Sequence, residues 1–383
     1  MGAHKNRYVR SLIVDLSVRF GGASVRAIGL LQAFPSGQAA LATLDNSPVA
    51  VEATARDLEV YPVGRHKADP RIAARISRLV RTGGFQVLDS QNTQSKFWST
   101  VAAQRTGAAL VSTLNSWYES EHGGRPKGLV YQTIERLTTR FTDMFIAVST
   151  DINRRLLNQG VPDNAVAMIP NAVKIDPGGI DVDGKWLRAT YRLPPGARVC
   201  CAVGRLVEAK GYAHLIRGIA GINDKDQHCL IVGGGRLHSE LTALILRLGE
   251  RERIHLLGFR DRMEALKIIK AADIFLMPSV TEGTPIALLE AAALSRPIVA
   301  SRVGGIPDIV SHGKHALLVQ PGNELEIADA IQKLYAQPDL ARDLGKRAHD
   351  HIIENYSVNT QAGFTQRAYE LALTRSRQRL ARI

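Results

Sequence analysis

The sequence is poor in cysteine, with only Cys200, Cys201 and Cys229 in 383 residues. Two of them are adjacent and all three stand inside apolar runs, so they lack the spaced pairs that a zinc site needs. Because free cysteine is among the most buried residue types, we expect all three to pack in a core. Such sparse cysteine, without a spacing pattern, favours a reducing compartment.

Long apolar runs are also absent. No window approaches 18 uninterrupted apolar residues, which argues against a membrane-spanning helix. The apolar run in residues 1–17 is too short for a secretory signal, and we therefore expect a cytoplasmic protein. Low-complexity blocks are missing as well, and a content of 45% hydrophobic and 22% charged residues is ordinary for a globular chain.

Negative charge is in deficit, and the formal net charge is +13. A basic balance attracts polyanions such as phosphorylated substrates, anionic lipids or nucleic acid. Residues 1–175 hold 21 Lys and Arg against 13 Asp and Glu, so the first half is the better candidate for contact with an anionic surface. No aromatic side chains interleave a basic stripe, and we predict no nucleic-acid partner.

One basic segment, residues 70–82, has helical periodicity. Its arginines fall on one face and its aliphatic side chains on the other: Arg71, Arg75 and Arg78 against Ile72, Ile76, Leu79 and Val80. The favoured interpretation is a helix that packs by its apolar face and leaves its charges in solvent. The alternative is peripheral contact with an anionic membrane, on its inner face.

Strand-like and helix-like runs alternate along the chain, and this pattern occurs twice. The expected strands are 9–16, 38–44, 58–64, 86–90, 108–114 and 144–149, then 198–203, 228–232, 253–257, 273–278, 297–301 and 316–320. The expected helices include 22–34, 70–82, 94–106, 211–220, 237–249, 261–271, 285–294 and 324–335. Short apolar runs separated by amphipathic stretches indicate parallel sheets with helices on both faces.

A turn-rich stretch from Pro170 to Pro195 separates the two series and predicts a linker. The length also exceeds the usual limit of one hydrophobic core. We therefore predict an α/β chain with two Rossmann-like domains facing each other across a cleft, at residues 1–172 and 173–354. A helix at about 355–383 is expected to pack back onto the first domain. Ligands of such sheets bind beyond the carboxyl ends of the strands.

The most informative segment is SVTEGTPIALLEAAALSRP, residues 279–297. Thr284 is expected to cap a helix whose first turn contains Pro285. That helix is apolar on every side except at Glu290. A lone carboxylate in a buried helix is costly unless something hydrogen-bonds it, and the paired hydroxyls of a ribose would do so.

The start of this helix is a candidate phosphate site. Gly283 allows close approach of a ligand to the backbone, and a helix N-terminus favours an anion. Glu282 stands immediately before it and is expected to face the cleft. The alternative interpretation is an ordinary helix start followed by a structural Glu.

A second motif, CAVGRLVEAKGY, covers residues 201–212. A strand is expected to end at Gly204, with Arg205 and Lys210 in the loop that follows its carboxyl end. Two cations at a strand end suit a diphosphate leaving group, whose negative charge grows as the bond breaks. By itself the motif is also compatible with a turn that carries solvated charges.

Two glycine-rich segments follow expected strands. LIVGGGRL, residues 230–237, can hold a nucleotide by its backbone N–H groups, but it lacks the G-x-G-x-x-G spacing of a nicotinamide site. FGGASVR, residues 20–26, lets a phosphate or sugar approach the first strand. Asp45 stands where a dinucleotide fold has its ribose-binding acid, but the third glycine of that fold is missing.

Together these motifs resemble the family-4 retaining glycosyltransferases of GT-B fold. The resemblance covers most of the chain, and its most specific mark is the pair Glu282 and Glu290, separated by seven residues. Its further motifs are TDMFIAVST (142–150), IPNAV (169–173), GRLVEAKG (204–211), IVGGG (231–235), LLGF (256–259) and RPIVASRVGGIPDIV (296–310).

The resemblance implies transfer of a hexose-type sugar from a nucleoside-diphosphate sugar to a glycan, a lipid-linked acceptor or a small molecule, in polysaccharide or glycoconjugate biosynthesis. It implies no metal and no cofactor besides the donor. The implied catalytic residues are Glu282, at the donor sugar, and Arg205 and Lys210, at the diphosphate. The implied donor-binding residues are Gly204, Gly233, Gly234, Leu257, Gly258, Phe259, Gly283, Thr284, Pro285, Ile286 and Glu290. Gly21, Gly22 and Asn115 would line the acceptor side.

Two positions depart from the family. Asn115 stands where many relatives have a His, and it cannot carry a proton, although it can bind a sugar hydroxyl. Arg302 stands where relatives often have an acid. Two alternatives therefore stay open: a non-catalytic nucleotide-sugar-binding protein, and a nucleotide-sugar epimerase, which the spacing of Glu282 and Glu290 disfavours.

Overall fold

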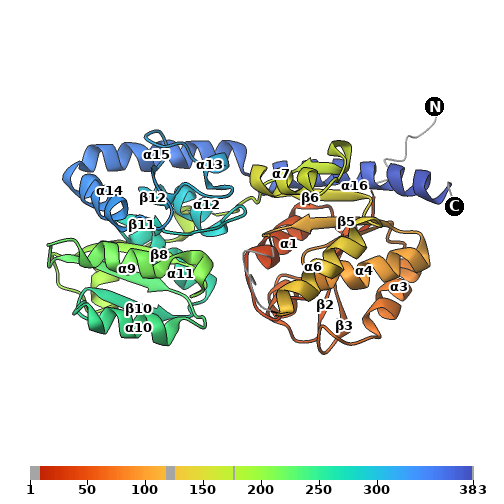
Figure 1. The fold of residues 1–383 in the computed structure, drawn as a ribbon, viewed down its shortest axis with the longest axis horizontal. Helices are drawn as coiled ribbons and strands as arrows, with labels where there is room; N and C mark the ends of the chain where they lie inside the picture. Colours follow the sequence, from red (N-terminus) through yellow and green to blue (C-terminus); the bar gives the residue numbers. More distant parts are fainter. Residues whose placement is uncertain (1–8, 118–125, 176, 382–383) are drawn as a thin grey trace. The chain divides into compact units, whose positions relative to one another are not determined.

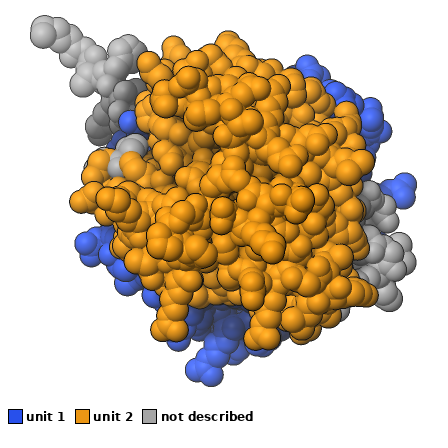
Figure 2. Space-filling model, turned by 90° about the vertical axis from the view of Figure 1, so that its left-hand side faces the viewer, with its two compact units in different colours: residues 1–172, 358–383 blue, residues 173–357 orange. Residues whose placement is uncertain are grey.

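The computed structural model describes residues 9–117, 126–175 and 177–381, and it divides into two compact units. Unit 1 comprises residues 1–172 with 358–383, and unit 2 comprises residues 173–357, as Figure 2 colours them. Each unit is a parallel sheet flanked by helices (Figure 1). The prediction of an α/β chain with two Rossmann-like domains is thus confirmed.

Unit 1 is built on seven parallel strands. They are β1 (Ser11–Asp15), β2 (Ala39–Leu44), β3 (Val60–Gly64), β4 (Val87–Ser90), β5 (Ala109–Leu114), β6 (Met144–Ala147) and β7 (Val166–Met168). Its helices are α1 (Gly22–Ala33), α2 (Pro48–Thr54), α3 (Ile72–Gly83), α4 (Thr93–Thr106), α6 (Pro126–Thr139), α7 (Thr150–Asn158) and α16 (Val358–Leu380). The strand order is β3-β2-β1-β4-β5-β6-β7.

The apolar strands of unit 1 contribute side chains to two hydrophobic cores, because successive side chains point to opposite faces of a sheet. Leu12 and Val14 of β1 belong to the core that α3 and α4 cover. Ile13, between them, belongs to the core that α1 and α16 cover. The sheet is therefore buried on both faces, as its continuous apolar runs require.

Helix α16 is fixed to unit 1 by polar contacts as well as by packing. The hydroxyl of Tyr369, which is fully buried, donates to Oδ2 of Asp89 at 2.7 Å. Thr113 donates to the other oxygen of Asp89, also at 2.7 Å. Near the end of the helix, Arg379 pairs with Asp143 at 3.0 Å. The last helix of the chain is therefore part of unit 1.

Unit 2 is built on six parallel strands. They are β8 (Arg198–Val203), β9 (Gln227–Val232), β10 (Ile254–Gly258), β11 (Ile274–Met277), β12 (Ile298–Ser301) and β13 (Leu317–Val319). Its helices are α8 (Gly184–Thr190), α9 (Tyr212–Ala220), α10 (His238–Arg247), α11 (Arg262–Ala271), α12 (Ile286–Ala293), α13 (Ile306–Ile309), α14 (Glu324–Ala336) and α15 (Pro338–Asn355). The strand order is β10-β9-β8-β11-β12-β13.

The three cysteines lie in the middle of unit 2. Cys200 and Cys201 belong to β8, and Cys229 pairs in register with Cys200 from β9. All three are buried and free, which confirms their expected place in the core. Burial raises the pKa of the Cys201 thiol well above its usual range, so this side chain behaves as a small apolar residue.

The expectation of a linker from Pro170 to Pro195 is wrong in its second half. Helix α8 lies inside this stretch, and Asp183 caps it by accepting hydrogen bonds from the backbone N–H groups of Lys185 and Trp186. Leu187 is completely buried in the core of unit 2. Burial of this one face outweighs the turn-forming residues on either side of the helix.

Helix α3 packs by its apolar face. Ile72, Ile76 and Val80 are buried in the core of unit 1, whereas Arg71 and Arg78 are exposed. The packing interpretation of this basic segment is confirmed, because its apolar face is already covered by protein. Within the described ranges, no helix is long and apolar enough to cross a membrane.

Candidate functional site

The loops beyond the strands of unit 2 pack backbone against backbone. A Cβ placed on Gly233, after β9, would lie 1.9 Å from the carbonyl oxygen of Gly204, after β8. Gly304, after β12, has φ +56°, and its Cβ would lie 1.9 Å from the carbonyl oxygen of Glu282. Neither position has room for a side chain. The carboxyl edge of this sheet is therefore a tightly assembled surface.

Lys210 and Glu282 come together at this edge. Lys210 follows β8 and Glu282 follows β11, and the two form an ion pair between Nζ and Oε1. Ser279 donates to the same carboxylate oxygen at 2.7 Å. Both charged side chains are largely buried, at 21% and 8% exposure. The ion pair holds the ammonium group in place beside the start of α12.

Arg205, the second expected cation, is exposed at the same strand end. The hydrogen bond from Leu206 N to the carbonyl of Gly234, at 3.0 Å, ties its loop to the loop after β9. The side chain of Glu208, in the same loop, pairs with Arg236 across the two loops. The structure thus brings Arg205 and Lys210 to one edge of the sheet.

The start of α12 differs from the expected cap. The helix begins at Ile286 with Pro285 at its N-cap position, and no side chain caps it. The expectation that Thr284 caps the helix is therefore wrong, because Thr284 stands one residue before the N-cap position. Gly283, Thr284 and Pro285 are buried, while Ile286 is half-buried. The N–H groups of the first helical turn lack a side-chain acceptor and suit an anionic ligand.

Glu290 has a protein partner that the sequence did not suggest. The residue is 7% exposed, and its Oε1 accepts a hydrogen bond from Nε of Arg262 at 2.9 Å. Burial raises the pKa of the Glu290 carboxyl, and the guanidinium of Arg262 opposes that rise. Arg262 therefore offsets part of the free-energy cost of burying this carboxylate. Burial alone does not require a ribose as its partner.

Three of the implied donor-binding residues, Leu257, Gly258 and Phe259, close the same edge. Leu257 and Gly258 end β10 and are half-buried, and the carbonyl of Gly258 accepts a hydrogen bond from Gly233 N at 2.9 Å. Phe259 follows with 74% exposure. An exposed aromatic ring next to a glycine loop is able to stack on a base.

In unit 1 the expected acceptor glycines follow β1. Gly21 occupies the N-cap position of α1, Gly22 is the first helical residue, and no side chain caps the helix. A Cβ placed on Gly21 would meet no atom of its unit within 4 Å. Space beside the backbone is thus present at this loop, in contrast to Gly233 and Gly304 of unit 2.

Asn115 follows β5 and pairs with Gln91, which follows β4. Its Nδ2 donates to the backbone carbonyl of Gln91 at 3.2 Å and to the side-chain oxygen at 3.3 Å. Oδ1 of Asn115 is buried and finds no hydrogen-bond partner in the described part of the chain, whereas the side chain of Gln91 also interacts with Asp89. One acceptor is therefore ready for a hydroxyl-bearing ligand.

Four contacting residues were missed by the sequence analysis: Ser279, Arg262, Gly304 and Gln91. Ser279 and Gly304 stand inside motifs already recognised, PSVTEG and RVGG, so their place in those motifs was a usable signal. Arg262 and Gln91 contact their partners only through the fold. Arg302 lies exposed beyond β12, and the structure gives no account of its departure from the family.

Comparison with known proteins assigns both halves of the chain to one family. The model of the glycosyl transferase 4-like domain matches residues 6–172, and that of glycosyl transferases group 1 matches residues 186–351. An uncharacterized glycosyltransferase of Methanocaldococcus jannaschii is 28% identical over 63% of this chain and 63% of its own length. The D-inositol 3-phosphate glycosyltransferase of Corynebacterium jeikeium is 31% identical over 57% of this chain and 60% of its own.

The chain thus matches less than two thirds of the length of these curated relatives. A solved structure, Anabaena HepE in complex with UDP-glucose, superposes with a TM-score of 0.82 over 93% of this chain and 98% of that chain. At 20% identity this likeness shows a shared fold. The two family models and the shared fold agree with the motifs, and the chain belongs to the family-4 glycosyltransferases of GT-B fold.

Proposed function

We propose that this protein is a retaining glycosyltransferase that moves a hexose from a nucleoside-diphosphate sugar to a glycan, lipid-linked or small-molecule acceptor, in polysaccharide or glycoconjugate biosynthesis. The observation that carries the proposal is the meeting of Lys210 and Glu282 beside the uncapped start of α12. A cation, a carboxylate and the backbone N–H groups of an uncapped helix start suit the transfer of a sugar from a nucleoside diphosphate.

The diphosphate is the leaving group, and its negative charge grows as the bond to the sugar breaks. Lys210, Arg205 and the first-turn N–H groups of α12 are proposed to stabilise that charge. They are in place before the donor binds, so little reorganisation is needed during the reaction. Because these groups supply positive charge, we propose that transfer needs no metal ion.

Glu282 has two partners in the donor-free protein, Lys210 and Ser279. When the diphosphate binds Lys210, the carboxylate is released to hydrogen-bond the sugar and to stabilise positive charge at its anomeric carbon. The acceptor hydroxyl attacks the anomeric carbon from the face that the diphosphate leaves, which retains the configuration, and its proton passes to the departing diphosphate oxygen. Asn115 and Gln91 cannot supply a general base, so leaving-group stabilisation is the main catalytic effect in this proposal.

The nucleoside is proposed to lie between Glu290 and Phe259. Glu290 and Arg262 offer a charged acceptor and donors to the ribose hydroxyls, and Phe259 offers a face to the base. Uridine is the first candidate base, because the solved HepE structure holds UDP-glucose.

The test is a thermal-shift panel with UDP, GDP and ADP, followed by measurement of nucleotide release from their hexose conjugates. One nucleotide should stabilise the protein in proportion to its occupancy. NMR of the released sugar before mutarotation should show the anomer of the donor. Glu282→Gln should abolish release, while Glu240→Gln, at an exposed site on α10, should not. Binding without release in the wild type would favour a non-catalytic binding protein, and no binding would refute both.

A further inference from the structure

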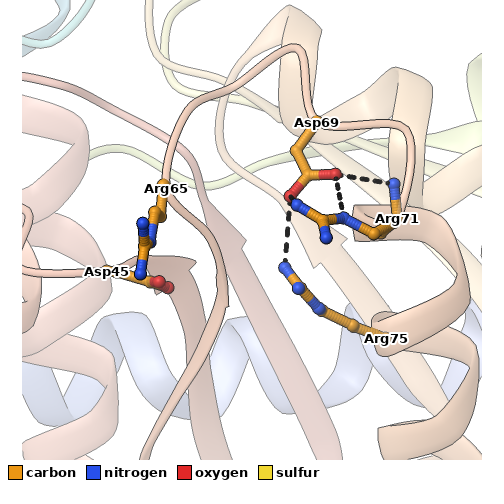
Figure 3. Close-up of a pocket in the computed structure, with 5 residues that line it drawn as sticks. All are labelled: Asp45, Arg65, Asp69, Arg71 and Arg75. Carbon is orange, nitrogen blue, oxygen red and sulfur yellow. Dashed lines mark hydrogen bonds and ion pairs between the residues drawn. The ribbon is translucent and has the colours of Figure 1, made fainter.

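A cavity of about 420 Å³ lies in unit 1 beyond β2 and β3. Figure 3 shows the five side chains that line it: Asp45, Arg65, Asp69, Arg71 and Arg75. We name this cavity the arginine pocket. Asp45 follows β2, Arg65 follows β3, and the other three come from the approach to α3 and its first turn. The pocket uses none of the residues assigned to the donor.

Two of the arginines are held in place by one buried carboxylate. Oδ1 of Asp69 accepts from Nε of Arg71 at 2.9 Å, and Oδ2 accepts from Nη1 of Arg75 at 3.3 Å. Arg75 also donates to the backbone carbonyl of Val63 at 2.9 Å. The hydrogen bonds from Arg71 lower the pKa of Asp69 to about 2. The carboxylate therefore stays charged and fixes both guanidinium groups.

The third arginine, Arg65, has fewer contacts. Arg65 is exposed and makes no hydrogen bond or ion pair to another described residue, although Figure 3 shows it beside Asp45. The side chains of Arg71 and Arg75 are 72% and 42% exposed, and each guanidinium retains N–H groups that Asp69 does not use. Three cations against two carboxylates leave the pocket with a positive charge and open donors.

We propose that the arginine pocket binds a phosphate monoester carried by the acceptor, an inference that rests on the proposed function. Guanidinium groups match the oxygens of a phosphate, and three of them suit a dianion. The pocket lies at the same carboxyl edge as Gly21, which follows β1. The ends of β1 and β3 are two strand spacings, roughly 10 Å, apart. A phosphorylated monosaccharide is of that size.

The test is calorimetric titration of the full chain with inorganic phosphate at constant ionic strength. Arg65→Gln should weaken phosphate binding by about tenfold or more, because the hydrogen bond between a guanidinium and a phosphate is charge-assisted. Arg65 holds no other residue, so this variant should fold normally. Arg78→Gln, which removes the same charge from an exposed position of α3, should bind like the wild type. Equal phosphate binding by both variants, or no saturable binding by the wild type, would overturn the proposal.

Two further measurements identify the anion that the pocket binds and the kind of molecule that carries it. Malonate, a dicarboxylate, should bind more weakly than phosphate, and equal or tighter malonate binding would overturn the assignment to phosphate. Phosphatidylcholine vesicles with and without phosphatidic acid then test a lipid source. Loss of vesicle binding in Arg65→Gln would place the phosphate on a lipid, whereas phosphate binding without vesicle binding would place it on a soluble acceptor.

The donor site supplies an independent control. Arg65→Gln should leave the binding of nucleoside diphosphates unchanged, because its side chain lies in unit 1. If the wild type binds no nucleotide but its phosphate binding is weakened by Arg65→Gln, the proposed function is rejected and the phosphate site is supported. If the wild type binds a nucleotide but Arg65→Gln binds phosphate as well as the wild type does, the phosphate site is rejected and the proposed function is supported.

Discussion

The carboxyl edges of the two sheets are built in different ways. In unit 2 the loops touch through their backbones, and the charged residues pair with one another, as Lys210 does with Glu282. In unit 1 there is space beside Gly21, an unpaired amide oxygen at Asn115 and a cavity beyond β2 and β3. Unit 2 thus presents closed backbone packing at this edge, whereas unit 1 leaves open space that charged and polar side chains line.

The largest expected effect tests the charged part of unit 2. Lys210→Met removes the cation from the diphosphate and should lower turnover of the donor about 100- to 1000-fold, as loss of a preorganised transition-state donor does. The measurement is nucleotide release under saturating donor. Lys225→Met, at an exposed site, is the matched control and should retain full activity. Retained activity in Lys210→Met would remove this residue from the mechanism.

The next effect tests the backbone packing. Gly304→Ala places a Cβ against the carbonyl oxygen of Glu282 at a positive φ, and should cost roughly 3 kcal/mol of unfolding free energy. Gly21→Ala, in unit 1, meets open space at an extended backbone and should cost close to nothing. Denaturant unfolding followed separately for each unit gives both values. Similar costs at the two positions would erase the contrast between the two edges.

A smaller effect tests the pairing of Arg262 with Glu290. Arg262→Leu leaves a buried carboxylate without its cation and should destabilise unit 2 by ~2 kcal/mol, less than for a fully buried pair because the arginine side chain is 31% exposed. The double variant, in which Glu290→Leu is added, should recover part of that loss. Thermal unfolding of the three proteins measures the coupling. Additive losses would show that the two side chains do not interact.

The smallest effect concerns the buried carboxyl of unit 1. Burial raises the pKa of Asp89 above its usual range. The folded chain then holds this proton more tightly than the unfolded chain. Its stabilising contribution is complete below the unfolded pKa of about 3.9 and is lost as the pH rises through the folded pKa. Asp89→Asn should flatten that fall in the stability of unit 1, and an unchanged slope of stability against pH above about pH 4 would contradict it.

The sequence predicts the regular parts of this chain well. The twelve expected strands are present within a few residues, because short apolar runs between amphipathic stretches form parallel strands in any such fold. Strand β7 and helix α8 were not predicted, since β7 has three residues and α8 stands among glycines and prolines. Packing in the fold, as at Leu187, decides such short segments.

The candidate site divides in the same way. Lys210 and Glu282 were found because they stand in contiguous motifs of unit 2. Arg262 was missed because its partner is 28 residues away, and only the fold brings the two together. The arginine pocket was not predicted, although Arg71 and Arg75 stand in the basic segment 70–82, because only the fold brings them to Asp45 and Arg65 at two strand ends. Sequence therefore predicts the donor side more completely than the acceptor side.

The central claim is that a nucleoside diphosphate binds at the carboxyl edge of unit 2. Hydrogen exchange of the full chain, with and without the nucleotide that gives the largest thermal shift, tests it most directly. The account predicts slowed exchange in residues 203–212, 233–237 and 282–288. Nucleotide binding that leaves these three segments unprotected would contradict it.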